Sequence, residues 1–276
     1  GANRTSALVT EVLLPLAGER RVHGNASFLP EYVERAVQCA VSKKAGIALM
    51  HSHLGPGWQG MSSDDVAAER NLAPAAQGAT GLPLVGLTLG TDGAWSARFW
   101  PKRGPRDYER QWCQSVRVVG DALRVTSYDQ LLPVPASGPE LTRTVSAWGD
   151  DKQAELARLH IGIVGAGSVG CIVAEALARM GICNITLLDF DAVEQINLDR
   201  LLHATSDDIG KAKVGVLAAA LRKSATARPF AVHPSEHSIV EDAGFRTALD
   251  CDLLFSCVDR PWARFALNLI AYAHLI

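Results

Sequence analysis

Residues 161–170 read Ile-Gly-Ile-Val-Gly-Ala-Gly-Ser-Val-Gly, an apolar run followed by three glycines in the spacing GxGxxG. The apolar run predicts a buried strand, and residues 168–180 have the apolar spacing of a helix. Glycines at these positions permit a tight turn and let backbone N–H groups approach a phosphate or a ribose. The stretch therefore predicts a strand, a nucleotide-binding loop and a helix, in the order that such a site requires.

Strand-like and helix-like segments alternate through the rest of this half of the chain. We expect strands at residues 160–164, 184–189, 229–233 and 253–257. We expect helices at residues 168–180, 211–224 and 261–273. This alternation predicts an α/β fold with a doubly wound, Rossmann-like parallel sheet that has helices on both faces. Asp189 ends the second strand, 19 residues after Gly170, where a carboxylate can bind ribose hydroxyls.

The N-terminal half has a different pattern, which predicts an α+β domain with a mixed sheet and helices. We expect strands at residues 7–14 and 46–50 and helices at residues 29–44 and 64–76. Residues 83–90 and 95–100 should form a hairpin around Asp92-Gly93. The prolines and glycines of residues 132–149 are typical of a linker. The predicted organisation is a domain over residues 1–131, a linker over 132–149, and a second domain over 150–276.

The composition of the chain excludes several classes of protein. Its 276 residues carry a formal net charge of −2, whereas nucleic-acid-binding proteins are usually basic. No apolar run reaches the roughly 18–20 residues that a membrane-spanning helix needs. The six cysteines include no CxxC pair, so they predict reduced thiols in a cytoplasmic protein rather than a cysteine zinc site. A start at Gly1 and an apolar C-terminal end lead us to expect a piece of a longer polypeptide, with its second domain incomplete.

Two histidines follow the predicted strand over residues 46–50. His51 and His53 alternate along an extended chain, so their imidazoles face one side. Together with Asp65 they offer three N/O ligands and leave zinc a fourth position for water, as a catalytic zinc site requires. Ser62 is a candidate hydrogen-bond donor to a developing oxyanion. The alternative interpretation is that the histidines are ordinary loop residues and that Ser62 only caps the next helix.

The order His-x-His, eight residues, then Ser-x-x-Asp resembles that of the JAB/MPN (JAMM) zinc metallopeptidases. Members of this family remove ubiquitin or ubiquitin-like proteins, and the resemblance covers about residues 1–125. It implies that His51, His53 and Asp65 are zinc ligands and that Ser62 supports the oxyanion.

The chain departs from the JAB/MPN pattern at two points. Leu54 stands where the family usually has proline, and the spacer is one residue longer than its shortest form. The family's general-base glutamate lies on an early strand, which makes Glu11 the candidate base in this chain. The position of Glu11 fits the following strand better, which would place the family's glutamate before Gly1.

Charged residues after the glycine loop distinguish a triphosphate site from a dinucleotide site. Arg200 and Lys213 are cations of the kind that a triphosphate needs, and Asn197 precedes them. Asp259 follows the strand over residues 253–257, where a carboxylate can hold Mg²⁺ beside phosphates. The alternatives are that Arg200 and Lys213 are solvated surface charges and that Asp259 only favours a helix dipole.

The segments Leu187–Arg200 and Ile209–Lys213 resemble the ThiF/MoeB/ubiquitin-activating enzyme family, over about residues 140–276. Enzymes of this family use ATP and Mg²⁺ to adenylate the C-terminal glycine of a ubiquitin-like protein. The resemblance implies that Asp189 binds the ribose and that Asp259 binds Mg²⁺. It implies that the phosphates are bound by Asn197, Arg200 and Lys213, and that the glycine loop is formed by Gly165, Gly167 and Gly170. Arg143 is the nearest candidate for an arginine that the family often supplies from a partner subunit.

Together the two resemblances imply a fused peptidase and activating enzyme of a bacterial ubiquitin-like conjugation system, with Zn²⁺, ATP and Mg²⁺ as cofactors. Both halves would act on the same glycine tail, and the partners would be a ubiquitin-like protein, a conjugating enzyme and a second copy of the chain. Two alternatives stay open. One is an NAD-dependent oxidoreductase built on the glycine loop, and the other is a non-catalytic scaffold that binds a ubiquitin-like protein.

Overall fold

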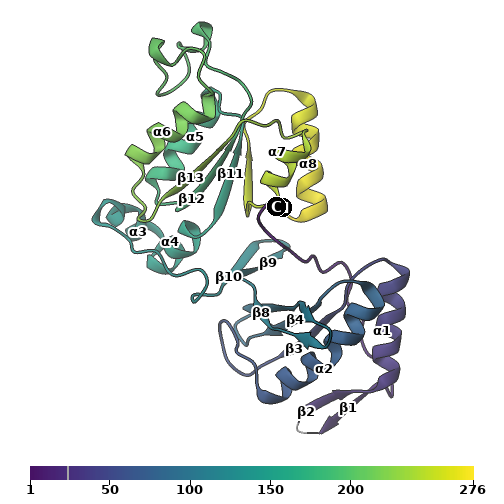
Figure 1. Ribbon diagram of the computed structural model, residues 1–276. Helices are drawn as coiled ribbons and strands as arrows, with labels where there is room; N and C mark the ends of the chain where they lie inside the picture. The colour runs from purple at the N-terminus through teal and green to yellow at the C-terminus, as the bar shows by residue number, and fades with distance from the viewer. Residues whose placement is uncertain (24) are drawn as a thin grey trace. The chain divides into compact units, whose positions relative to one another are not determined.

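The computed structural model describes residues 1–23 and 25–276, and it divides the chain into two compact units (Figure 1). The N-terminal unit consists of Ala7–Pro133. The C-terminal unit consists of Val134–Ile276 together with Gly1–Ser6. Each unit buries its own cluster of apolar side chains, so each is described by itself.

The C-terminal unit is built on a parallel sheet with the strand order β13-β12-β11-β14. Its strands, in chain order, are β11 (His160–Val164), β12 (Asn184–Leu188), β13 (Ala231–Ser235) and β14 (Leu253–Ser256). Figure 1 shows α5 (Ser168–Arg179) and α6 (Lys213–Ser224) on one side of the sheet and α7 (Asp242–Ala248) and α8 (Pro261–His274) on the other. The prediction of a doubly wound α/β fold is confirmed for this unit.

The order of the strands places the glycine loop at a switch in the chain's direction. From β11 the chain moves to β12 and β13 on one side, and it returns to β14 on the other side of β11. In open parallel sheets, ligands bind at the carboxyl edge where the order reverses in this way. The loop that follows β11 lies at this edge.

Of the predicted linker over residues 132–149, residues 132–138 form no helix or strand, as expected, but the residues that follow are mostly helical. They contain the short helix η1 (Pro139–Leu141) and α3 (Thr142–Trp148), which α4 (Asp150–Ala157) follows. Leu141 is buried in the C-terminal unit. Pro139 stands at the first position of η1, and Gly149 ends α3, so these residues mark helix ends rather than a loop.

The first six residues also depart from the predicted domain organisation, because they belong to the C-terminal unit. The backbone N–H groups of Asn3 and Arg4 donate to the carboxylate of Asp250 over 2.8 and 2.9 Å. The guanidinium of Arg4 pairs with Asp252 at 2.7 Å. Charge-assisted bonds of this kind are stronger than neutral ones, and they hold the segment on the corner before β14.

The N-terminal unit has a mixed sheet with the strand order β3-β4-β5-β8. Its strands are β3 (Ala48–Ser52), β4 (Leu84–Leu89), β5 (Trp95–Trp100) and β8 (Gln111–Trp112), of which β3 and β4 are parallel and the other pairs antiparallel. The helices are α1 (Pro30–Ser42) and α2 (Ser63–Thr80). The N-terminal unit also contains antiparallel pairs of short strands. These pairs are β1 (Arg20–His23) with β2 (Asn25–Phe28), β6 (Lys102–Gly104) with β7 (Asp107–Tyr108), and β9 (Ser115–Val119) with β10 (Leu123–Ser127). The predicted mixed sheet with helices is confirmed.

The predicted strand over residues 7–14 is wrong. These residues form no regular element, and no described strand pairs with them. Leu8, Val9, Val12 and Leu14 are all exposed. An alternating apolar pattern forms a strand only where a neighbouring strand takes up its backbone hydrogen bonds, and this segment has none.

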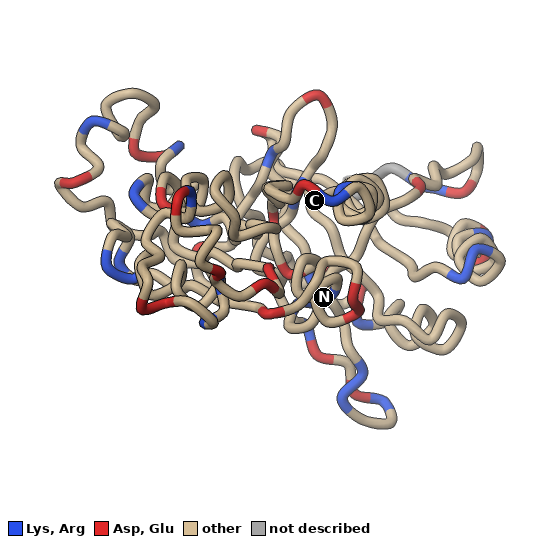
Figure 2. The backbone as a smooth tube through the Cα atoms, turned by 90° about the horizontal axis from the view of Figure 1, so that it is seen from above, with Lys and Arg blue, Asp and Glu red and all other residues tan. Residues whose placement is uncertain are grey.

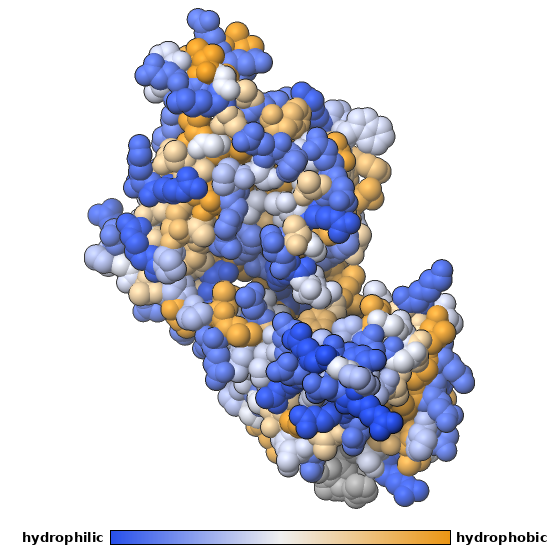
Figure 3. Space-filling view, viewed as in Figure 1, coloured by the Kyte–Doolittle hydropathy of each residue, from blue (hydrophilic) through white to orange (hydrophobic). Residues whose placement is uncertain are grey.

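Lys and Arg are interspersed with Asp and Glu along the backbone, as the small net charge of −2 implies (Figure 2). The face drawn in Figure 3 is mostly hydrophilic, with hydrophobic patches scattered over both units. Among the described residues, no helix has the length and apolar character needed to cross a membrane.

Candidate functional site

Three side chains of the N-terminal unit bring potential metal-binding atoms together. The Nε2 atoms of His51 and His53 lie 3.2 Å apart, and they lie 3.3 and 3.1 Å from the carboxylate oxygens of Asp65. Four ligands at the usual zinc distances of about 2.0–2.1 Å form a tetrahedron with edges of about 3.3–3.4 Å. Each of these distances is close to such an edge, with the two histidines nearest different oxygens of Asp65, and the sequence-predicted ligands meet in one place.

Hydrogen bonds alone cannot pair the two imidazoles and the carboxylate of this group favourably. Each imidazole Nε2 carries at most one hydrogen, and the carboxylate of Asp65 carries none when it is ionised. If both nitrogens donate to the carboxylate, the two N–H groups face each other across 3.2 Å. A single cation at the centre accepts a lone pair from all three groups, so the residues present fit a divalent metal.

Strand β3 and helix α2 supply these ligands. Beyond the end of β3 the backbone N–H of His53 still donates to Leu89 at 2.9 Å, which keeps His53 in line with the strand. Ser62 caps α2, because its hydroxyl accepts from the Asp65 N–H at 3.1 Å while Asp65 accepts from the Ser62 N–H at 2.8 Å. Ser62 is thus a helix cap, as one interpretation of the sequence expects, and the same reciprocal bonds aim Asp65 at the histidines.

The surroundings of Asp65 and His51 favour the forms of these two groups that bind a cation. Burial by itself raises the pKa of Asp65, but the hydrogen bonds from Ser62 and the charges of His51 and His53 outweigh it and hold the pKa below its usual range. Burial lowers the pKa of His51, although the charge of Asp65 opposes this. An ionised carboxylate and a neutral imidazole are the species that ligate zinc.

A buried ionic network lies beside the three ligands, and the sequence analysis did not identify it. The Nε of Arg98 donates to Glu69 at 2.9 Å, a second guanidinium nitrogen bonds the other oxygen of Glu69, and the Trp100 indole donates to Glu69 at 2.6 Å. Arg98 also donates to the Thr88 hydroxyl at 2.6 Å. All four residues have an exposed fraction of 0%. The sequence feature that could have indicated this network is Arg98, a charged residue within the largely apolar residues 95–100.

Glu11 is not brought to the three ligands. It forms an ion pair with Lys43, just after the C-terminal end of α1, and its side chain is 45% exposed. Because residues 7–14 form no strand, the alternation that would have aimed Glu11 at a site does not exist. The structure therefore gives no support to Glu11 as the base.

The glycines of the C-terminal unit shape the loop after β11. Gly165 has a φ of 98°, and a Cβ there would lie 2.6 Å from the backbone oxygen of Cys257. A Cβ on Gly170 would lie 1.8 Å from the oxygen of Gly165. Gly167 is the N-cap of α5. The loop and the first turn of α5 therefore pack at distances that only glycine permits at residues 165 and 170.

Asp189 and Lys213 lie beside this loop. One carboxylate oxygen of Asp189 accepts from the N–H of Ala166 at 2.7 Å, and the other accepts from the N–H of Asp191 at 2.8 Å. Lys213 pairs with the Asp191 carboxylate at 2.9 Å and is only 12% exposed. Ala166 and Lys213 also line one small hollow together. The structure thus brings the glycine loop close to one predicted phosphate-binding cation.

The other predicted nucleotide residues have local partners. The side chain of Asn197 is buried and accepts from the N–H of Glu194 at 3.1 Å, which caps the short helix η2 (Gln195–Asn197). Arg200 is half exposed and binds Asp199 and the carbonyl of Ile196, both at 2.8 Å. Asp259, which follows β14, is exposed, and so is Arg143 on α3. No described contact joins these four residues to the glycine loop.

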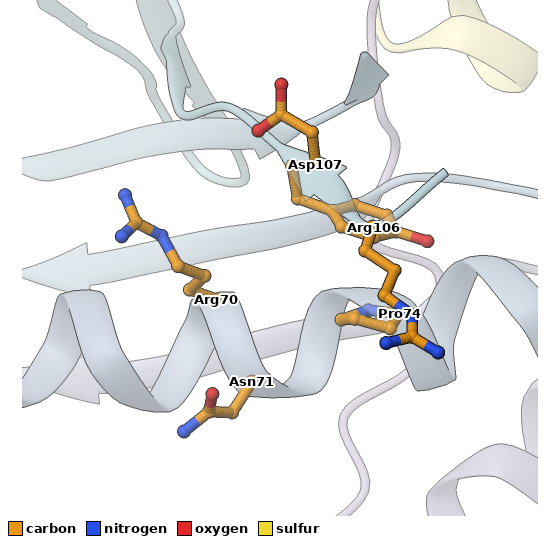
Figure 4. Close-up of a pocket in the computed structure, with 6 residues that line it drawn as sticks. Arg70, Asn71, Pro74, Arg106 and Asp107 are labelled. Carbon is orange, nitrogen blue, oxygen red and sulfur yellow. The ribbon is translucent and has the colours of Figure 1, made fainter. Parts of the chain in front are cut away.

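A hollow of about 510 Å³ lies on the N-terminal unit, and none of the predicted site residues lines it. Helix α2 contributes Arg70, Asn71 and Pro74, the turn between β6 and β7 contributes Arg106, and β7 contributes Asp107 (Figure 4). The buried Tyr108 is also part of its lining. No sequence motif indicates this hollow, because its residues come from a helix and a hairpin that meet only in the fold.

Comparison with known proteins addresses the C-terminal unit. Residues 141–276 match the model of the ThiF family. The tRNA threonylcarbamoyladenosine dehydratase of Escherichia coli K12 is 44% identical over 80 residues, which are 29% of this chain and 30% of that protein. The ubiquitin-like modifier-activating enzyme 5 of Drosophila melanogaster is 35% identical over 120 residues, which are 39% of this chain and 29% of that protein.

A crystal structure of the E. coli tRNA N6-threonylcarbamoyladenosine dehydratase is similar to this chain, with 29% sequence identity and a TM-score of 0.46. The aligned region covers 50% of this chain and 57% of that chain. The chain spans about 30% of the length of the curated relatives it matches. The predicted resemblance of the C-terminal half is confirmed at the level of the family. Residues 141–276 form a ThiF-family domain.

Proposed function

We propose that the C-terminal unit adenylates the C-terminal carboxylate of a ubiquitin-like protein at the expense of ATP. The observation that carries the proposal is the ThiF-family match over a sheet whose glycine loop lies beside Asp189 and Lys213. One matched relative is named as a ubiquitin-like modifier-activating enzyme. Another is named as a tRNA-modifying dehydratase, so a modified nucleoside is the competing class of substrate.

In this reaction a carboxylate oxygen attacks the α-phosphorus, a P–O bond forms, and pyrophosphate leaves. The protein positions the two reactants and neutralises the phosphates. Asp189 would accept hydrogen bonds from the ribose while it holds the loop through Ala166, and Lys213 would bind phosphate oxygens. Asp259, after β14, would hold Mg²⁺, which neutralises phosphate charge when it is bound.

We also propose a zinc-dependent peptidase activity on the same glycine tail for the N-terminal unit. The group of His51, His53 and Asp65 supports it, since the two Nε2 atoms and the nearest carboxylate oxygens lie 3.1–3.3 Å from one another, close to the ligand separation of a tetrahedral zinc site. Zinc bound there would supply a polarising cation for a peptide carbonyl. The hydroxyl of Ser62 acts as an acceptor in its capping bond, so its hydrogen is available to an oxyanion.

ATP–pyrophosphate exchange tests the adenylation. The chain is incubated with ATP, Mg²⁺, labelled pyrophosphate and a ubiquitin-like protein that ends in glycine. Label should enter ATP only when the ubiquitin-like protein is present, and not when its terminal glycine is removed. Exchange that depends on tRNA, or NADH binding without any exchange, would contradict the proposal.

Metal analysis and a cleavage assay test the peptidase. We expect one zinc per chain and cleavage of a ubiquitin-like fusion after its glycine tail, both abolished by a chelator. Zinc binding without cleavage, together with binding of the fusion, would support a scaffold instead.

A further inference from the structure

The chain between β12 and α6 forms a loop that is closed at its base. The N–H of Val193 donates to the carbonyl of Lys211, and the carbonyl of Val193 accepts from the N–H of Gly210, both over 2.8 Å. Residues 194–209 lie between these bonds, and we call them the crossover loop. The bonds at the base fix where this loop begins and ends, so other contacts have to hold its middle against the rest of the unit.

The middle of the crossover loop forms one wall of the small hollow beside the glycine loop. This loop contributes Leu201, Leu202 and Ala204 to the lining. Ala166 of the glycine loop and Lys213 line the same hollow. A shift of residues 201–204 would therefore change the space next to the proposed phosphate-binding cation.

His203 stands within this wall and binds a residue of α5. Its Nε2 lies 3.2 Å from a carboxylate oxygen of Glu175. The φ of His203 is 72°, in the left-handed region that residues other than glycine seldom adopt. A residue in this region costs free energy and keeps its conformation only where the surrounding contacts hold it. The bond to Glu175 is a contact that can hold His203 in this conformation.

Glu175 is itself held in place by donors from two helices. One of its oxygens accepts from the Ser224 hydroxyl of α6 at 2.8 Å, and the other accepts from Arg179 at 2.6 Å. Burial by itself raises the pKa of Glu175, but the bonds from Ser224 and Arg179 outweigh it and hold the pKa below its usual range. His203 therefore meets a fixed, ionised carboxylate, to which an imidazole with a hydrogen on Nε2 donates whether it is neutral or charged.

Helix α5 connects this contact to the nucleotide site. The helix begins at Ser168, directly after the glycine loop, and Glu175 follows two turns later. The same rigid element therefore carries the glycine loop at its start and the partner of His203 on its side.

We infer that Glu175 and His203 are positioning residues for the nucleotide site. Their bond anchors the wall formed by residues 201–204 to the helix that begins at the glycine loop, so that the hollow beside Lys213 keeps its shape before a nucleotide binds. The inference rests on the proposed adenylation. It assigns a role to two residues that no sequence motif singles out.

The ATP affinity of the full chain, measured by calorimetric titration, tests the inference. His203→Asn removes the imidazole but keeps a side chain that accepts the left-handed backbone. Glu175→Gln leaves one acceptor oxygen where three donors meet. We expect each variant to weaken ATP binding by about three- to tenfold, and the double variant to lose less than the sum of the two, because both changes remove one shared interaction.

Kinetics separate this role from a general loss of structure. In the ATP–pyrophosphate exchange assay, His203→Asn should raise the KM for ATP and leave kcat within about twofold. A partly unfolded protein would instead lose kcat and keep its KM. His237→Asn is the matched control, because it makes the same change in an exposed histidine–glutamate pair of the same unit, and it should match the wild type.

Amide hydrogen exchange tests the anchor without a nucleotide. Residues 194–209 should exchange faster in His203→Asn than in the wild type, while β11 and β12 stay protected. Unchanged exchange in the crossover loop, a wild-type KM in His203→Asn, or additive losses in the double variant would overturn the inference. Failure of the wild type to bind ATP would overturn the proposed adenylation, and hydrogen exchange would still decide whether the anchor exists.

Discussion

The carboxylate of Asp189 bonds the backbone N–H of Ala166 at 2.7 Å, so the end of β12 is tied to the glycine loop that follows β11. Its second oxygen bonds the N–H of Asp191 at 2.8 Å. The two predicted elements of the nucleotide site therefore support each other before any nucleotide binds.

Asp189→Asn should weaken nucleotide binding. An amide offers one acceptor oxygen where the carboxylate offers two, so one backbone N–H loses its partner and the ribose loses a charged acceptor. Hydrogen bonds to charged groups are worth about 1.5–3 kcal/mol, which corresponds to a roughly ten- to hundredfold loss of ATP affinity. Calorimetric titration with ATP measures it, and an unchanged affinity would show that Asp189 has only a structural role.

Lys213 and Lys211 form a matched pair for testing the phosphate contact. Lys213 is 12% exposed beside the loop, whereas Lys211 is 60% exposed and pairs with Asp208. Lys213→Met should raise the KM for ATP at least tenfold in the exchange assay, because a buried cation is lost beside the phosphates. Lys211→Met should leave the KM within about twofold, since exposed ion pairs contribute little. Equal effects at the two positions would argue against a specific role for Lys213.

His53→Ala should abolish bound zinc. The substitution removes one of three protein ligands, and the remaining His51 and Asp65 offer too few donors for a stable site. His237→Ala is the control, because His237 is an exposed histidine that pairs with Glu241 in the other unit. Zinc content is measured by mass spectrometry of the purified variants after dialysis. Full occupancy in His53→Ala would reject the ligand assignment.

Gly86→Ala should destabilise the N-terminal unit by about 1–3 kcal/mol. Its Cβ would lie 2.3 Å from a carboxylate oxygen of Glu69, and buried, hydrogen-bonded charges cannot move aside cheaply. Gly78→Ala on α2 meets nothing within 4 Å and should stabilise by about 0.5–1 kcal/mol through helix propensity. Urea unfolding of both variants checks the difference. A stable Gly86→Ala protein would mean that the Arg98–Glu69 pair can shift.

The stability of the C-terminal unit should fall as the solution becomes acidic, in part because of His160. Burial lowers the pKa of His160 below 6.5, against the opposing charge of Asp252, and its Nε2 lies 2.7 Å from the Thr186 hydroxyl. The unfolded chain therefore takes up a proton at a pH where the folded chain does not. The contribution of His160 is complete above about pH 6.5 and decreases below it, by at most about 1.4 kcal/mol per pH unit.

Urea unfolding at about pH 7.5 and 5.5 measures this loss. The difference between the two pH values should shrink in His160→Gln, which keeps a hydrogen-bonding side chain but does not titrate. An identical difference in the variant would assign the pH dependence to other groups.

The alternation of the C-terminal half could be read from the sequence because its signals are local. Strand β11 occupies the predicted residues 160–164, and α5 begins at the predicted Ser168. Glycine punctuation and short apolar runs determine such elements without reference to the rest of the fold. The meeting of His51, His53 and Asp65 was also predictable, since all three lie within fifteen residues of sequence.

Features that depend on distant partners could not be predicted in this way. No described strand pairs with the apolar pattern of residues 7–14, and Pro139 and Gly149, within the predicted linker, mark the ends of helices. Arg98 and Glu69 are 29 residues apart, on a strand and a helix, and neither stretch shows that the other exists. Only the packing of α2 against β4 and β5 brings them together.

The assignment of Gly1–Ser6 to the C-terminal unit makes Ala7–Pro133 an insertion in the chain, joined at both of its ends to the same body. A single proteolytic cut between residues 134 and 138 would therefore leave the two fragments associated, as long as Asp250 holds the N–H groups of Asn3 and Arg4. Limited proteolysis would then show two bands on a denaturing gel but one species in solution.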